Sequence, residues 1–414
     1  MKKLLIAFLV FLCATGYSNQ RNKQNDPYYI DGKVTRQVLE NYLCRSVTMS
    51  EFLTVDPFCI DGTYPCKDED IRFIKNTGAK FIGRSIYRWG SEEILNNPEF
   101  WSNAKNIIEK VHKNDPDVIF QAAAFEAVFK GVSAIKIPEW TFIALGVPVE
   151  DRNFSYASML DPKGKFINQW GKGGSVPDIT RVETQLWFFY LIGSYVNIGI
   201  EAVHLGQVAL IGMNDPRLET WSSFMKKVRI YTSKIARRHI VLFDAHTPGG
   251  GMVIDGVSLL DFNSFPLRIK EVPEKPMECI LEKGHLDSMY GRSKGCKTPG
   301  GWSCESLPYL VEFDNFGISD HPGVANIKDH YVWGYDEISW FYMQNKEYKI
   351  QWLQYAYEWL KENDKNAFLE MPGARVVTRG KGEPVICCRA IAPSPGCPYG
   401  MDLEQTIKDI WAGK

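Results

Sequence analysis

Carboxylate side chains stand at the ends of several short apolar runs in this sequence of 414 residues. Two carboxyl groups that flank a glycosidic bond are able to cleave it, because one protonates the leaving oxygen while the other attacks the sugar or activates water. The sequence offers more such groups than this chemistry needs. The catalytic candidates are Glu312, Asp314, Asp244 and Glu126.

Other polar and aromatic residues beside these runs have types that suit sugar binding. Amides, imidazoles and guanidinium groups hydrogen-bond hydroxyl groups, and flat rings stack on the apolar faces of pyranoses. The substrate-binding candidates are Gln207, His246, Arg84, Trp89, Trp333 and Glu370. Arg84 and Arg88 would suit a uronate or sulfated sugar. The structural alternatives are that the aromatic rings pack loops and that the arginines form ion pairs with the acids.

The elements that must position these residues alternate along the chain. Short apolar or β-branched runs are each followed by a segment with helical period or by a longer connection. The strands are expected at 52–60, 79–87, 117–126, 201–207, 240–246, 258–263, 309–315 and 367–372. The helices are expected at 67–76, 91–113, 178–197, 215–236, 345–362 and 402–412.

This order predicts an α/β fold, a (β/α)8 TIM barrel with loop insertions at 127–177 and 268–306. An open doubly wound sheet is the competing arrangement. That fold usually has a glycine-rich phosphate loop after an early strand, and the run 52–60 is followed by none. In a barrel the active site lies at the carboxyl ends of the strands, where the candidate acids stand.

Strand alternation predicts which candidates share a side. Glu312 and Asp314 are expected to point the same way, as are Asp244 and His246, whereas His204 and Gln207 are expected on opposite sides. Carboxylates inside a barrel must reach solvent, pair with cations or meet a ligand, because an isolated buried charge is costly.

The N-terminus has the pattern of a secretory signal. Lys2 and Lys3 precede an uncharged run from Leu4 to Leu12, and small residues follow it. We therefore expect a signal peptide at 1–16, a leader and N-terminal segment at 17–50, and the catalytic barrel at 51–414. The location would be secreted or periplasmic. If Cys13 carries a lipid, the protein would be an outer-membrane lipoprotein, which is the one membrane attachment expected.

With this signal, the strand ends "AVHLGQ", "VLFDAH", "YLVEFDNFG" and "FLEMPG" resemble a secreted bacterial glycoside hydrolase of the TIM-barrel superfamily over residues 50–414. In the large retaining group of that superfamily, a Glu ending strand four is the acid/base and a Glu ending strand seven is the nucleophile. Glu312 matches the second position. Gln207 stands at the first, and an amide cannot protonate a leaving group.

Three explanations for Gln207 stay open. The strand count is off by one, the acid comes from Glu126, Asp244 or Glu370, or the protein binds sugar without cleaving it. The preferred pairing is Glu312 or Asp314 with Asp244 or Glu126.

Composition narrows the possible partners. A formal net charge of -1 argues against a nucleic-acid partner, which needs a basic field. The run 52–60 has no histidine, so a metal-dependent hydrolase is the weaker enzyme alternative, and no metal and no cofactor are expected. The expected partner is an oligo- or polysaccharide.

The clustered cysteines at 279–304 and 387–397 suggest disulfides that hold loops.

Overall fold

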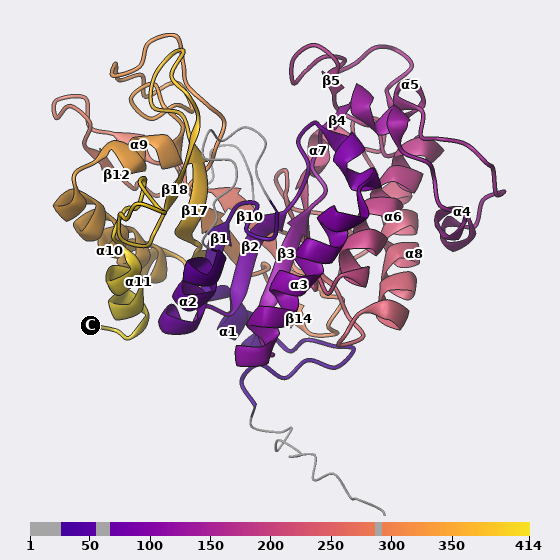
Figure 1. Cartoon of the computed structure of the whole chain (residues 1–414), viewed down its shortest axis with the longest axis horizontal. Coiled ribbons are helices and arrows are strands. Elements are labelled where there is room, and N and C mark those ends of the chain that lie inside the picture. Colours follow the sequence, from indigo (N-terminus) through magenta and orange to yellow (C-terminus); the bar gives the residue numbers. More distant parts are fainter. Residues whose placement is uncertain (1–25, 55–66, 286–291) are drawn as a thin grey trace, which may run out of the picture.

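The computed structural model describes residues 26–54, 67–285 and 292–414. Its main sheet has ten strands in the order β16-β15-β10-β7-β6-β3-β2-β1-β17-β18. Neighbouring strands are parallel except for β17 and β18 (Figure 1). The strands are β1 (Ser46–Met49), β2 (Phe81–Ile86), β3 (Ile119–Ala123), β6 (Ala202–Gln207), β7 (Leu242–His246), β10 (Asn263–Pro266), β15 (Tyr309–Glu312), β16 (Ala367–Leu369), β17 (Met371–Val377) and β18 (Ile386–Arg389).

One stretch of chain supplies both ends of the parallel sheet. Strand β16 pairs with β15 at one end, and β17 pairs with β1 at the other. Only Glu370 separates β16 from β17 in the sequence, so the sheet curls until its two ends meet. The chain therefore has the expected α/β fold, a strongly curled parallel sheet with alternating helices in a TIM-barrel-like domain.

All six expected helices are present, although the second begins at Pro98 instead of residue 91. They are α2 (Lys67–Thr77), α3 (Pro98–Asn114), α6 (Val182–Asn197), α8 (Glu219–Ile235), α10 (Lys346–Asn363) and α11 (Glu404–Trp411). Their starts follow local rules. Asn97 accepts a hydrogen bond from the Glu99 amide ahead of Pro98, and Asn345 caps α10 through the Tyr348 amide. The short helix α9 (Glu337–Met343), capped by Asp336, was not expected from the sequence.

The two insertions contain short elements of their own. The first holds β4 (Val128–Phe129), η2 (Lys130–Ala134), α4 (Glu139–Leu145), α5 (Tyr156–Met159) and β5 (Gly174–Ser175). The second holds β11 (Lys270–Glu271), β12 (Cys279–Ile280), β13 (Cys296–Lys297) and β14 (Ser303–Cys304). Elsewhere lie η1 (Glu92–Asn96), α7 (Val208–Ile211), β8 (Val253–Ile254) and β9 (Val257–Ser258).

A helix closes the amino-terminal end of the barrel. In α1 (Arg36–Leu43), Leu39, Tyr42 and Leu43 are buried against Phe81, Ile119, Ala202, Leu242, Phe262 and Leu310, which lie at or near the starts of six strands. These apolar contacts remove the lower barrel end from water. The carboxyl ends of the strands are the end left for a functional site.

Two strand predictions are wrong. The first barrel strand is β1 rather than 52–60, so the barrel begins before residue 51. Residues 51–54 form a turn after β1, and 55–66 lie outside the described residues. Strand β1 was missed because all four residues are buried and two of them are Ser46 and Thr48, which breaks the expected apolar pattern.

The sixth strand is β10 rather than 258–263. Asp261 precedes it and plays a structural part, because its Oδ2 accepts hydrogen bonds from the Phe243 amide and from Arg229, at 2.8 and 2.9 Å. The eighth strand was expected to stop at Pro372. It continues through β17 to Val377, because Pro372 lies in a stretch where the chain passes from one partner strand to the next.

The expected signal segment and Cys13 lie outside the described residues. In the part of the chain that the structure does describe, no helix combines the length and hydropathy needed to cross a membrane.

Candidate active site

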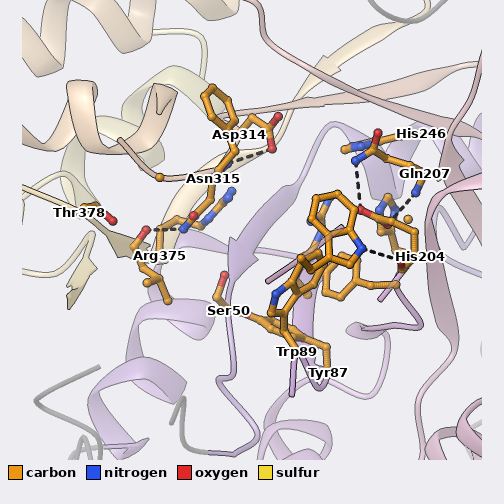
Figure 2. A pocket seen from close by; sticks show the side chains of 18 of the residues that line it. Ser50, Tyr87, Trp89, His204, Gln207, His246, Asp314, Asn315, Arg375 and Thr378 are labelled. Atoms are coloured by element: carbon orange, nitrogen blue, oxygen red, sulfur yellow. Dashed lines mark hydrogen bonds between the residues drawn. The ribbon is translucent and has the colours of Figure 1, made fainter. Parts of the chain in front are cut away.

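A cavity of about 490 Å³ opens at the carboxyl ends of the barrel strands. Figure 2 shows His204, Gln207 and His246 on one side of it, and Asp314, Asn315, Arg375 and Thr378 on the other, with Tyr87 and Trp89 along its edge. The lining residues are Ser50, Arg84, Tyr87, Trp89, Phe125, Glu126, Trp170, His204, Gly206, Gln207, His246, Asp314, Asn315, Phe316, Gly317, Arg375, Val376, Thr378 and Val385.

Glu126 follows β3 and reaches across to the end of β6. Its Oε2 accepts a hydrogen bond from the Gln207 amide at 2.8 Å, and its Oε1 accepts one from Gln207 Nε2 at 3.1 Å. Gly206 makes this contact possible, because a Cβ there would lie 2.0 Å from Glu126 Oε2. The carboxyl group of Glu126 thus lies at the end of β6, beside Gln207, the amide residue that ends this strand.

Asp314 lies just beyond the end of β15, on the opposite side of the cavity. The backbone amide of Asp314 donates a hydrogen bond to Glu337 Oε2 at 2.9 Å. Arg268 places a guanidinium nitrogen 3.6 Å from Asp314 Oδ2. Of the described residues that line the cavity, Glu126 and Asp314 are the two with carboxyl groups.

Glu312 lies buried beneath the cavity. Arg84 and Arg375 form ion pairs with it, the second at 3.4 Å, and His246 Nε2 lies 3.1 Å from its Oε1. Burial alone would raise the pKa of Glu312, but the two arginines and His246 hold it well below its usual range. Glu312 is therefore a fixed negative charge that orients three cavity-lining residues.

Asp244 is also buried and belongs to a separate polar network. It accepts hydrogen bonds from Gln121 Nε2 at 2.7 Å and from the Ser264 hydroxyl, and its Oδ2 lies 2.7 Å from His204 Nδ1. Burial raises the pKa of Asp244 to about 7 and, together with the Arg84 charge, lowers the pKa of His204 well below its usual value. The network holds His204 in place against the cavity.

Glu370 fills the seam where the barrel closes. Its carboxyl group lies over Gly83, where a Cβ would come within 1.9 Å of Oε1. Burial and the neighbouring charge of Glu312 raise the pKa of Glu370 to about 7. Glu370 thus carries a proton in mildly acidic solution, at the point where β16 passes into β17.

Four aromatic rings form one wall of the cavity. Trp89 meets Phe125 and Trp170 edge to face, with ring centroids 5.5 and 5.2 Å apart, and Tyr87 meets Phe125 at 5.2 Å. Trp170 comes from the first insertion, and its Nε1 donates to the Glu126 carbonyl at 2.9 Å. The insertion therefore helps to build the cavity as well as covering the barrel.

The structure brings together most of the residues expected from the sequence. Glu126, Asp314, Gln207, His246, Arg84 and Trp89 line the cavity, whereas Glu312, Asp244 and Glu370 lie beneath or beside it. Trp333 lies elsewhere: it is buried, and its Nε1 donates to the Glu278 carbonyl at 3.1 Å. Arg88 also lies away from the cavity, buried in an ion pair with Glu51 at 2.6 Å.

Sequence reasoning missed Arg375, His204 and Trp170. Arg375 follows Pro372, where the strand was expected to have stopped. His204 was expected to face away from Gln207, yet both line the cavity. The pairing of β6 with β7 shifts register between these residues, where Gly206 has a φ of 64°. The glycine between them is the one signal for this shift that the sequence contains.

The buried carboxyl groups predict that the free energy of unfolding falls as the pH rises from about 4.5 to about 7. Burial raises the pKa of Asp244, Glu337 and Glu370 to about 7 in the folded state, above the values of an unfolded chain. Between about pH 4.5 and about pH 7 the folded protein therefore keeps protons that the unfolded chain has already lost, and above about pH 7 both states are ionised. The free energy of unfolding is expected to fall between these two pH values, by up to about 1.4 kcal/mol per pH unit and group.

Glu370→Gln tests this expectation, because glutamine imitates the protonated acid. Urea unfolding should show a flatter loss of stability from about pH 5 to about pH 7 for this variant than for the wild type. The control is Glu109→Gln on the exposed side of α3. An unchanged slope in Glu370→Gln would remove Glu370 from the explanation.

Among the described residues, no group of three or more histidine, cysteine, aspartate or glutamate side chains is arranged to hold a metal ion.

Comparisons with known proteins give glycoside hydrolases of low similarity. No family model and no curated protein matches the chain. A maltogenic α-amylase from Thermotoga neapolitana matches 90% of this chain and 78% of its own, with a TM-score of 0.46 and 10% identity. A debranching enzyme from Nostoc punctiforme matches 93% and 81%, with a TM-score of 0.41 and 10% identity.

A third matched structure is a β-L-arabinopyranosidase from Geobacillus stearothermophilus in complex with arabinose. It matches 89% of this chain and 70% of its own, with a TM-score of 0.36 and 9% identity. All three TM-scores are below 0.5, so the assignment of the fold rests on the strand order and closure described above.

Proposed function

We propose that the protein hydrolyses glycosidic bonds, with Glu126 and Asp314 as its two catalytic carboxyl groups. The observation that carries the proposal is that these two groups lie on opposite sides of one cavity at the carboxyl ends of the barrel strands. Paired carboxyl groups on either side of the scissile bond are what this reaction requires.

The surroundings suggest a role for each carboxyl group. Asp314 lines the cavity and lies 3.6 Å from the Arg268 guanidinium, and we assign it the role of the nucleophile or of the base that activates water. Glu126 is contacted by the neutral amide groups of Gln207 and lies beside the aromatic wall. With Asp314 assigned to the other role, Glu126 is the carboxyl group left to protonate the leaving oxygen.

The aromatic wall supports a sugar as the ligand. Trp89 and Trp170 are both half-buried, so part of each ring remains open to a ligand. Stacking against such rings removes the apolar face of a pyranose from water. The hydroxyl edges of the sugar would then meet Gln207, His246, Asn315 and Arg375.

A second candidate function is carbohydrate binding without cleavage. It is favoured by Gln207, which stands at the end of β6 and engages both oxygens of Glu126. If these contacts persist with a ligand bound, Glu126 holds Gln207 in place instead of protonating a leaving group.

Asp314→Asn separates the two functions. The wild type should release sugar from at least one member of a panel of polysaccharides and aryl glycosides. The variant should lose that activity by about 10²–10⁴-fold while its affinity for the same saccharide stays within a few-fold. The anomer released by the wild type, read by proton NMR, tells whether Asp314 attacks the sugar or activates water.

Binding of a panel member without release of sugar by the wild type would favour the second function. Full activity in Asp314→Asn would exclude Asp314 from the chemistry.

We propose further that the protein acts outside the cytoplasm, because the first 16 residues have the pattern of a secretory signal. Mass spectrometry of the protein from its native host should then show a mature N-terminus after Gly16, or a lipid on Cys13. An intact Met1 would contradict export through this signal.

A further inference from the structure

We infer that the saccharide carries a carboxylate, as a uronic acid does, and that Arg375 binds this group. The inference rests on the proposed function, because it assigns the substrate class of the same cavity. It starts from Arg375, whose guanidinium lines the cavity although its side chain is only 4% exposed.

Arg375 is weakly engaged for a buried arginine. Its contact with Glu312 Oε2 is 3.4 Å, longer than the 2.7–2.9 Å typical of a charge-assisted hydrogen bond. Glu312 is already held by Arg84 and by His246. The Nε of Arg375 has no hydrogen-bond partner among the described residues. A guanidinium cannot lose its proton to relieve this state, so its buried charge calls for an additional anion.

The charges around Arg375 leave room for that anion. Arg84 and Arg375 share the single ionised carboxylate of Glu312. The neighbouring Glu370 is protonated in mildly acidic solution, because burial and Glu312 raise its pKa to about 7. The two guanidinium groups therefore share one carboxylate in direct contact on this side of the cavity.

The other nearby acids are balanced by their own partners. Asp314 faces Arg268 at 3.6 Å. Asp336 accepts hydrogen bonds from the amides of Gly317 and Ser339, both at 2.8 Å, and caps α9, whose positive end offsets its charge. Asp314 attracts Arg84 and Asp336 attracts Arg375 through longer-range Coulomb interactions, but in the described part of the chain neither acid forms an ion pair with either arginine.

The polar side chains beside Arg375 make this wall a better carboxylate site than an isolated guanidinium group would be. Ser50, Asn315 and Thr378 line the same side of the cavity and surround Arg375 in Figure 2. Hydroxyl and amide donors beside a guanidinium complete the hydrogen bonding of a planar two-oxygen anion. A uronic acid would turn its carboxylate to this wall and a ring face to Trp89.

The test compares trisaccharides that differ only in their carboxylates. Galacturonic, glucuronic and mannuronic acid trimers are titrated against the full chain at pH 6, beside their neutral counterparts, and binding is followed by ligand-observed NMR. At least one uronate should bind 10-fold or more tightly than its neutral counterpart. Arg375→Met should reduce this preference to under 3-fold.

Two further variants sharpen the result. Arg379→Met removes a partly exposed arginine that follows the same strand outside the cavity lining, and it should keep the full preference. Arg375→Lys keeps the charge but not the planar fork, so it should keep part of the preference even if Arg375→Met does not fold.

Equal binding of uronates and neutral sugars by the wild type would overturn this inference and leave the proposed function standing. A preference that survives in Arg375→Met, or a stronger preference for sulfated trisaccharides, would also overturn it. Failure of all trisaccharides to bind would remove both the inference and the proposed function.

Discussion

Glu126→Gln is expected to abolish hydrolysis, lowering kcat/KM by about 10²–10⁴-fold on any substrate that the wild type cleaves. Glutamine keeps the size of the side chain and one acceptor oxygen, so it preserves part of the contact with Gln207. It cannot donate the proton that the leaving oxygen requires. The loss should therefore appear in the chemical step while substrate affinity stays within a few-fold.

The choice of leaving group makes this expectation sharper. An aryl glycoside whose phenol is a good leaving group needs little protonation, so Glu126→Gln should slow it much less than a natural glycoside. The matched control is Glu139→Gln, which removes an exposed carboxyl group of the same insertion at the start of α4. Equal losses on both kinds of substrate would contradict the role of Glu126 as the acid.

Glu312→Gln is expected to cost the folded protein about 3–5 kcal/mol, the largest stability effect that we expect at the site. The substitution leaves Arg84 and Arg375 without their shared anion, while both guanidinium groups stay largely buried. The cost arises from these uncompensated charges more than from the lost hydrogen bonds. Urea unfolding at pH 7 measures it directly.

A double variant identifies the source of this cost. Adding Arg84→Met to Glu312→Gln removes one of the two uncompensated cations, so it should recover about 1 kcal/mol or more of the lost stability. The control is Glu404→Gln, which breaks the more exposed ion pair with Arg72 and should cost about 1 kcal/mol or less. If Glu312→Gln lost no more stability than this control, the ion pairs of Glu312 with Arg84 and Arg375 would not be a main source of stability at the site.

Glu126 and Glu312, both near strand ends, are thus expected to have different functions, one in the chemistry and one in stability. Two arginines and His246 bind Glu312, and Glu312 does not line the cavity. Asp314, two residues later, lines the cavity itself. We therefore propose Asp314, just past the end of β15, as the catalytic residue instead of Glu312.

The alternation of apolar runs and helical segments was enough to predict the barrel and the end at which polar residues gather. Those patterns are local, since each strand and helix shows its own periodicity and caps. They also named six of the residues that line the cavity, among them Glu126 and Asp314. Errors arose where a strand is short and fully buried, as in β1, or contains a proline, as in β17.

Tertiary structure alone decided which acids are accessible and which are buried. Glu126, Asp244 and Glu312 all end strand regions, but whether each meets a cavity or an arginine depends on residues distant in sequence, such as Gln207, His204 and Arg84. The side on which His204 lies depended on the register shift at Gly206. Burial and pairing are properties of contacts across the barrel, and no local pattern of residues records them.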